Sequence, residues 1–136
     1  MAETQIQRFN PVLRYADGEK AMAFLEEAFG FEPGPVHRSP DGVIVHAEMA
    51  LGGQYIGLSE RAKGENTIFD LGPCVVYVVL DDEAAIDAMH ARAASAGAEI
   101  VMEPQDQDYG SRDYSARDPE GHVWTFGTYR PAGGSG

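Results

Sequence analysis

The chain has 136 residues, 43% of them hydrophobic, which is enough material for the core of one domain. A formal net charge of −12 argues against binding to nucleic acid or anionic lipid and weakly favours a neutral or cationic ligand. No apolar stretch approaches the length of a membrane span. The single cysteine, Cys74, cannot form an internal disulfide, so we expect a cytoplasmic protein in which Cys74 is a buried structural thiol.

Hydrophobic periodicity and turn residues predict the same series of elements in each half of the chain. The first half contains strands at 6–15, 31–38, 43–51 and 54–59 and a helix at 19–29. The second half contains strands at 74–80, 98–103, 110–117 and 122–129 and a helix at 83–95. The prolines of 31–38 suit a strand at the edge of a sheet.

The residues that begin and end these elements recur at a nearly constant spacing, which indicates an internal duplication. The pairs are Asp17 and Asp82 at the helix starts, Gly30 and Gly97 at the helix ends, and Gly53 and Gly121 in the hairpins, with offsets of 65, 67 and 68 residues. The sequence therefore predicts an α+β domain over 1–130, with βαβββ units at about 6–61 and 73–130. Residues 131–136 have the composition of a flexible tail or a cloning remnant.

This duplicated pattern resembles the glyoxalase/bleomycin-resistance/dioxygenase (vicinal oxygen chelate) superfamily. The resemblance depends on four segments: Leu13-Arg14-Tyr15-Ala16-Asp17, His46-Ala47-Glu48-Met49, Tyr109-Gly110-Ser111-Arg112 and Asp118-Pro119-Glu120-Gly121-His122. It implies two tandem βαβββ units whose cupped mixed sheets surround a cavity, with the helices on the outer faces. It also implies a homodimer, because members of the family commonly pair across a two-fold axis.

The family's metalloenzymes bind a divalent ion through side chains of four strands. The resemblance places those positions at Asn10, Gly57 (or Ser59), Val75 and Thr125. None of these is a histidine or a carboxylate, and Gly and Val offer no ligand atom at all. We therefore expect no metal and no other cofactor, as in the metal-free, bleomycin-resistance-like branch.

Strand alternation predicts which side chains line the cup. Val45, Ala47 and Met49 form an apolar face for the helix, which leaves His46 and Glu48 inside. The 68-residue offset then places Arg112 and Tyr114 inside as well. The complete predicted lining is Val12, Tyr55, Val75, Tyr77, Val123 and Thr125 as walls, and Asn10, His46, Glu48, Arg112 and Tyr114 as polar contacts.

Three residues of the last hairpin are expected to lie outside the cup. Trp124 should be core, His122 should lie at the surface, and Asp118 should hold its turn.

The sequence supports three hypotheses on function. The first is a protein that binds or sequesters an apolar or aromatic ligand, either neutral or cationic, without a metal. The second is a metal-free isomerase or lyase that uses His46 or Glu48 as acid or base. The third is a metalloenzyme whose metal site is displaced from the usual positions.

Overall fold

The computed structural model describes residues 6–62 and 65–130 and contains two βαβββ units in tandem. The first unit comprises β1 (Val12–Tyr15), α1 (Gly18–Phe29), β2 (Glu32–Arg38), β3 (Ile44–Leu51) and β4 (Gln54–Glu60). The second comprises β5 (Val75–Val79), α2 (Glu83–Ser95), β6 (Glu99–Asp106), β7 (Arg112–Arg117) and β8 (Val123–Gly127). The predicted duplication is confirmed, whereas the predicted tail at 131–136 lies outside the described residues.

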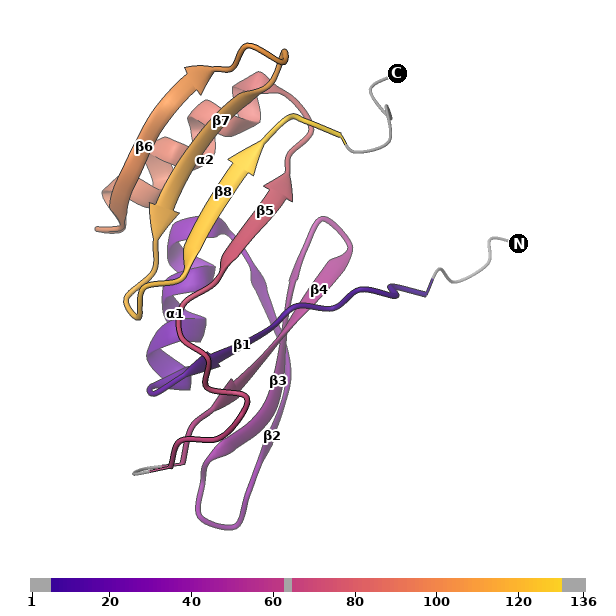
Figure 1. The fold of residues 1–136 in the computed structure, drawn as a ribbon, viewed down its shortest axis with the longest axis vertical. Coiled ribbons are helices and arrows are strands. Elements are labelled where there is room, and N and C mark those ends of the chain that lie inside the picture. Colours follow the sequence, from indigo (N-terminus) through magenta and orange to yellow (C-terminus); the bar gives the residue numbers. More distant parts are fainter. Residues whose placement is uncertain (1–5, 63–64, 131–136) are drawn as a thin grey trace.

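Each unit forms one mixed four-stranded sheet, with strand orders β1-β4-β3-β2 and β5-β8-β7-β6 (Figure 1). The first strand of each unit runs parallel to the last, and the remaining pairs are antiparallel. These sheets and two helices confirm the α+β fold expected from the repeat.

The helix boundaries follow from the capping residues that the sequence predicted. The Asp17 carboxylate accepts a hydrogen bond from the Lys20 amide at 3.0 Å, and Gly30 ends α1 with a φ of 77°. Asp82 accepts from the Ala85 amide at 2.9 Å, and Gly97 follows α2 with a φ of 86°. Because a left-handed φ favours glycine, both helices end where the sequence places a glycine.

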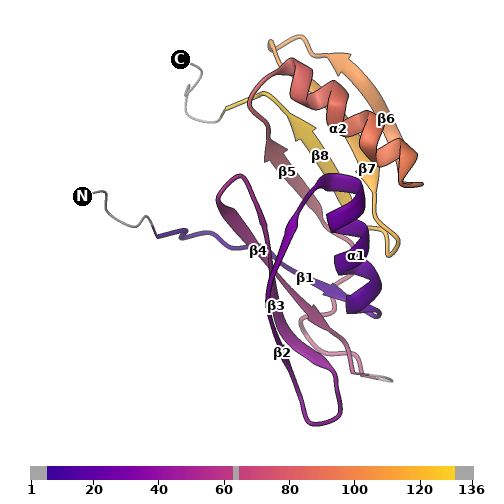
Figure 2. The ribbon, with the colours of Figure 1, turned by 180° about the vertical axis from the view of Figure 1, so that it is seen from behind.

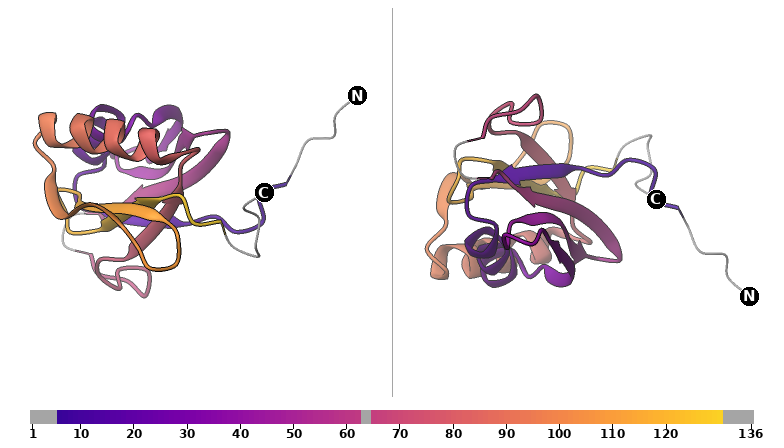
Figure 3. Two further views of the ribbon diagram at one scale, coloured as in Figure 1. Left: turned by 90° about the horizontal axis from the view of Figure 1, so that it is seen from above. Right: turned by 90° about the horizontal axis from the view of Figure 1, so that it is seen from below.

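Both helices lie on the same side of the two sheets (Figures 2 and 3). The Phe29 ring of α1 lies 5.8 Å from that of Trp124 and 4.7 Å from that of Phe126, both on β8. All three side chains are fully buried, as expected for Trp124, and burial stabilises each by about 2–3 kcal/mol. The helix-side faces therefore share one core, and the helix-free faces of both sheets are directed to the opposite side of the molecule.

Two strands differ most from their predicted ranges, and the bounds of the others shift by at most two residues. β1 begins only at Val12, and the Gln7 side chain instead bonds the Tyr55 backbone, donating to its carbonyl at 2.6 Å and accepting from its amide at 2.8 Å. β6 continues through Pro104 to Asp106 because it is an edge strand, where a proline removes no necessary hydrogen bond.

Candidate ligand-binding site

In the first unit, the helix-free face contains the two polar residues predicted there. Ala47 and Met49 are buried toward the helix, so His46 and Glu48 project to the other side. The prediction for Val45 was wrong: it is 55% exposed, and Ile44 is buried in its place. A register shift between β2 and β3 at this point reverses the alternation.

His46 and Glu48 form a loose pair on this face. The His46 Nε2 and Glu48 Oε2 atoms are 3.9 Å apart, and both side chains are partly exposed. Gly57 lies between them and β1, and a Cβ there would be 3.3 Å from His46 Cε1 and 3.1 Å from Val12 Cγ2. The missing side chain leaves room for the imidazole to lie over the strand.

In the second unit, the predicted positions of Arg112 and Tyr114 were wrong. Both face α2 rather than the helix-free side: Arg112 forms an ion pair with Asp87 at 3.0 Å, and the buried Tyr114 ring packs edge-on against His90 at 5.5 Å.

The error came from the repeat offset. Glu48 pairs with Gly57, which pairs with Val12; the corresponding series in the second unit is Arg117, Val123 and Val75. Arg117 follows Glu48 by 69 residues, so the offset of 68 moves every side chain of β7 to the wrong face. The two hairpins differ in their loops, Gly52–Gly53 in one and residues 118–122 in the other.

The β7 residues on the helix-free face are Asp113, Ser115 and Arg117. Asp113 is only 3% exposed. Its carboxylate accepts hydrogen bonds from the Tyr77 hydroxyl at 3.1 Å, from the Tyr109 hydroxyl at 2.9 Å and from Ser111. The sequence prediction included Tyr77 but missed Asp113 and Tyr109. An offset of 69 residues between the repeats, in place of 68, would have assigned Asp113 to the helix-free face.

A glycine again makes this arrangement possible. Gly127 faces the same side of β8, and a Cβ at this position would collide with the Tyr77 hydroxyl and with the Asp113 carboxylate. The Tyr77 side chain therefore extends from β5 across β8 to reach β7.

The other predicted wall residues lie on the helix-free faces. Val12, Tyr55 and Val75 are exposed, and Thr125 lies 2.7 Å from Ser115, oxygen to oxygen. Val123 is partly buried beside Val75. Asn10 precedes β1 and donates to the Gln7 carbonyl at 2.8 Å.

A crevice of about 540 Å³ lies between the two units. One wall comes from residues before β1 and from the β3–β4 hairpin, and the other from β5 and α2. Tyr55 and Leu51 line the first wall, and Tyr77, Val79 and Met89 line the second. Aromatic and aliphatic side chains on both walls suit an apolar guest.

Asp118 joins the two units at the opposite end of β8. It accepts hydrogen bonds from the Glu120 and His122 amides at 3.0 and 3.1 Å, which confirms its predicted role in the turn. It also accepts from the Tyr15 hydroxyl of the first unit and from Trp124 Nε1 at 3.1 Å. Burial raises the pKa of Tyr15, so its hydroxyl remains a neutral donor.

His122 and Cys74 differ from their predictions. His122 is 4% exposed rather than at the surface, because Nε2 lies 3.0 Å from the Arg14 carbonyl and Nδ1 accepts from the Cys74 amide at 3.0 Å. Cys74 is exposed rather than buried. Partial desolvation raises the pKa of its thiol, which is unfavourable for a nucleophile.

The residues at the family's metal positions do not fit a metal. Gly57, Val75 and Thr125 lie on the helix-free faces but offer at most one hydroxyl. Within 6–62 and 65–130, no three His, Cys, Asp or Glu side chains are grouped so that they could share an ion. Over the same residues, no helix is long and apolar enough to cross a membrane.

The family model of the Glyoxalase/Bleomycin resistance protein/Dioxygenase superfamily matches residues 5–126. The chain belongs to this superfamily. The resemblance inferred from the sequence motifs is thereby confirmed.

Relatives of this superfamily member include the uncharacterized protein Mb0911c of Mycobacterium bovis. It is 32% identical over 126 residues, which cover 87% of this chain and 80% of the relative. Among solved structures, TioX from Micromonospora sp. ML1 is 28% identical with a TM-score of 0.72, covering 90% of this chain and 99% of TioX. Lactoylglutathione lyase from Agrobacterium tumefaciens is 23% identical with a TM-score of 0.68, covering 91% and 95%, and shows the shared fold.

Proposed function

We propose that this glyoxalase-like protein binds a small apolar or aromatic molecule without the help of a metal. The observation that supports this most directly is the crevice between Tyr55 and Tyr77. Its volume of about 540 Å³ lies within the range of ordinary small-molecule sites. The lone cysteine supports a cytoplasmic location for this binding protein.

The proposed working form is a homodimer. Within one chain the helix-free faces do not cover each other, and Val12, Val75 and Tyr55 remain exposed on them. In the described part of the chain, β1 and β5 are also edge strands whose outer edges have no strand partner. A second copy placed over these faces would cover both features and enclose the ligand. Light scattering at micromolar concentration should give twice the chain mass of 14.7 kDa; a mass near 14.7 kDa would contradict the dimer.

The binding proposal can be tested with two matched substitutions on β5. Val79 lines the crevice, whereas Val75 lies on the same face of the same strand outside it. A tryptophan at either position adds the same volume. With the neutral fluorescent probe N-phenyl-1-naphthylamine, Val79→Trp should weaken binding at least about tenfold by filling the crevice. Val75 lies on the face proposed for the dimer, so both variants are first compared by light scattering. At the same mass as the wild type, Val75→Trp should bind the probe like the wild type.

Two results would contradict the binding proposal. One is a wild-type protein that does not bind the probe at saturating concentration. The other is equal binding by the Val79→Trp and Val75→Trp variants, since the probe would then occupy another surface.

A metal-free isomerase or lyase is the second candidate. It is supported by His46 and Glu48, which are partly exposed, lie side by side on the helix-free face and form no close ion pair. An isomerase or lyase should convert its bound ligand in a reaction that His46→Ala abolishes, whereas a binding protein should return the ligand unchanged. Elemental analysis that finds about one transition metal per chain would contradict both candidates and support a displaced metal site.

A further inference from the structure

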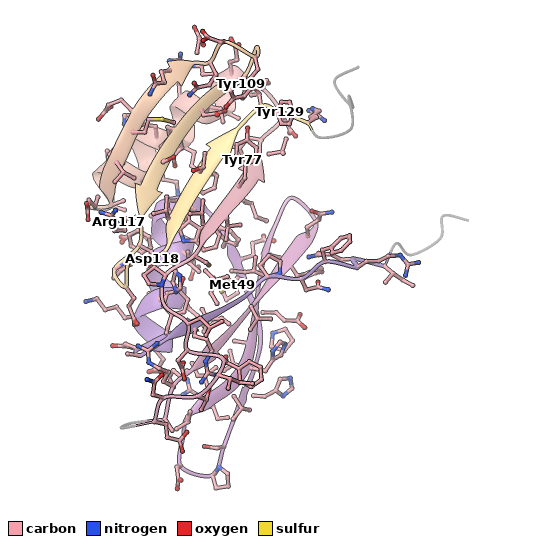
Figure 4. All side chains as sticks on the ribbon, in the orientation of Figure 1. Met49, Tyr77, Tyr109, Arg117, Asp118 and Tyr129 are labelled. Atoms are coloured by element: carbon pink, nitrogen blue, oxygen red, sulfur yellow. The ribbon has the colours of Figure 1, made fainter. Side chains whose placement is uncertain are left out.

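Tyr77, Tyr109 and Tyr129 lie near one another at one end of the second sheet (Figure 4). The Asp113 carboxylate accepts hydrogen bonds from the first two. Tyr77, Tyr109 and Tyr129 are 39%, 60% and 47% exposed, whereas Asp113 is almost completely buried. Within the described residues, Asp113 forms no ion pair with a basic side chain; all its side-chain donors are hydroxyl groups. We name Asp113 and these three tyrosines the tyrosine cluster.

The rings of the cluster are held in place by specific contacts. Tyr77 lies across Gly127, donates to Asp113 and accepts a hydrogen bond from the Tyr129 amide at 3.1 Å. Tyr109 donates to the other Asp113 oxygen. The Tyr109 and Tyr129 rings are nearly perpendicular, at 88°, with centroids 5.7 Å apart. Aromatic side chains thus form a fixed, solvent-facing rim over a buried negative charge.

Such an arrangement attracts cations for two physical reasons. The faces of aromatic rings attract positive charge. A phenol that donates a hydrogen bond to a carboxylate keeps its proton and has a more electron-rich ring. Among residues 6–62 and 65–130, no basic side chain neutralises the carboxylate, and the net charge of the chain is −12. The neighbouring Arg130 donates instead to the Asp81 carbonyl, at 3.3 Å.

The cluster is continuous with the crevice through one residue. Tyr77 lines the crevice beside Val79 and also contacts Asp113. A ligand with an apolar or aromatic body in the crevice could therefore place one end over the tyrosine rings.

We propose that the tyrosine cluster binds the cationic group of the ligand, an organic ammonium ion, while the apolar part occupies the crevice. This inference rests on the proposed binding function and adds the charge of the ligand to it. It also assigns the four residues that recognise this charge.

The test compares two probes of the same shape. Benzyltrimethylammonium and its uncharged carbon isostere neopentylbenzene are each used to displace N-phenyl-1-naphthylamine from the wild-type protein. The ammonium should bind about tenfold more tightly than the isostere. If N-phenyl-1-naphthylamine binds but the two competitors are equal, the cation site is wrong and the binding function stands. If no probe binds at all, the binding function itself is wrong.

Substituted variants then show which residues produce the preference for the ammonium probe over its uncharged isostere. Asp113→Asn removes the charge but keeps an acceptor, and Tyr109→Leu removes a largely exposed ring. Each variant should reduce the ratio of the two affinities, that of benzyltrimethylammonium over that of neopentylbenzene, to about threefold or less. Tyr55→Leu, on the opposite wall of the crevice, should weaken both probes equally and preserve the ratio. Thermal melting identifies an unfolded Asp113→Asn protein, in which case Tyr109→Leu decides. A ratio that neither folded variant changes would overturn the assignment.

Discussion

Asp113 and Asp118 lie at opposite ends of the second sheet, and each is a buried carboxylate that accepts hydrogen bonds from tyrosine. Their donors differ. Asp118 receives the hydroxyl of Tyr15, the indole of Trp124 and two backbone amides, all from buried or partly buried groups. Asp113 receives two of its bonds from tyrosines whose rings face solvent.

This difference separates a structural carboxylate from a candidate binding carboxylate. The Tyr15 hydroxyl, the Trp124 indole and the His122 amide belong to buried residues, so they depend on the Asp118 carboxylate as their acceptor. The Tyr15 bond also connects the first unit to the second. The tyrosines of Asp113 can turn to water instead. Two of the three side-chain donors of Asp113 are exposed tyrosines, so we expect this carboxylate to contribute less to stability than Asp118 and to be available to a ligand.

The largest expected effect comes from removing each carboxylate in turn. Asp118→Ala leaves the Tyr15 hydroxyl, the Trp124 indole and two amides without their acceptor and should lower the free energy of unfolding by roughly 3–5 kcal/mol. Asp113→Ala should cost only about 1–2 kcal/mol, because Tyr77 and Tyr109 regain hydrogen bonds with water. Urea denaturation of both variants measures the two losses. Equal losses would mean that Asp113 is as structural as Asp118.

A smaller loss of stability is expected from substituting the two glycines that make room for polar side chains on the helix-free faces. Gly127 adjoins Tyr77 and Asp113, and Gly57 adjoins His46. In Gly127→Ala the new methyl collides with Tyr77 and Asp113, so the variant should lose about 1–3 kcal/mol of stability together with the cation preference. In Gly57→Ala the tight contacts of the methyl are with side-chain atoms of Val12 and His46, which can move, and the Pro11 carbonyl oxygen is at an ordinary 3.7 Å. The loss of stability should therefore stay below about 1 kcal/mol.

Thermal and urea unfolding of the two alanine variants test this second comparison. A Gly127→Ala protein as stable as the wild type would show that Tyr77 does not need the space above β8.

The sequence predicted the fold far better than the polar lining of the site. Capping residues such as Asp17 and Asp82 act locally, so the helices and their order could be placed without knowing any long-range contact. The face of a strand is different, because a change of one residue in register reverses it. The bulge at Val45 and the longer loop 118–122 each introduced such a change.

Contacts between distant segments explain the remaining errors. His122 follows a turn, which is typical of a surface residue, but its partner Arg14 lies on β1 and its partner Cys74 directly precedes β5. The pairing of Asp113 with Tyr77 also joins positions far apart in the sequence, so no local pattern predicts it. His46 and Glu48 each lie between two apolar residues on their strand. There the alternation of polar and apolar residues was sufficient to assign both side chains to the helix-free face.

Asp70 provides the smallest expected effect, and it differs from both other carboxylates in having a guanidinium partner. Arg14 Nε lies 3.0 Å from Asp70 Oδ1, and this hydrogen bond, with that of the Thr67 amide, lowers the pKa of Asp70 to about 2. The unfolded chain has an ordinary aspartate pKa near 4, so the contribution to stability is complete above about pH 4 and is lost as the pH falls toward 2. Asp70→Asn should therefore be less stable than the wild type at pH 6, and the difference should shrink progressively between pH 4 and pH 2. Urea midpoints measured across this range give the difference directly; a constant difference would show that the charge of Asp70 contributes nothing and that only its hydrogen bonds matter.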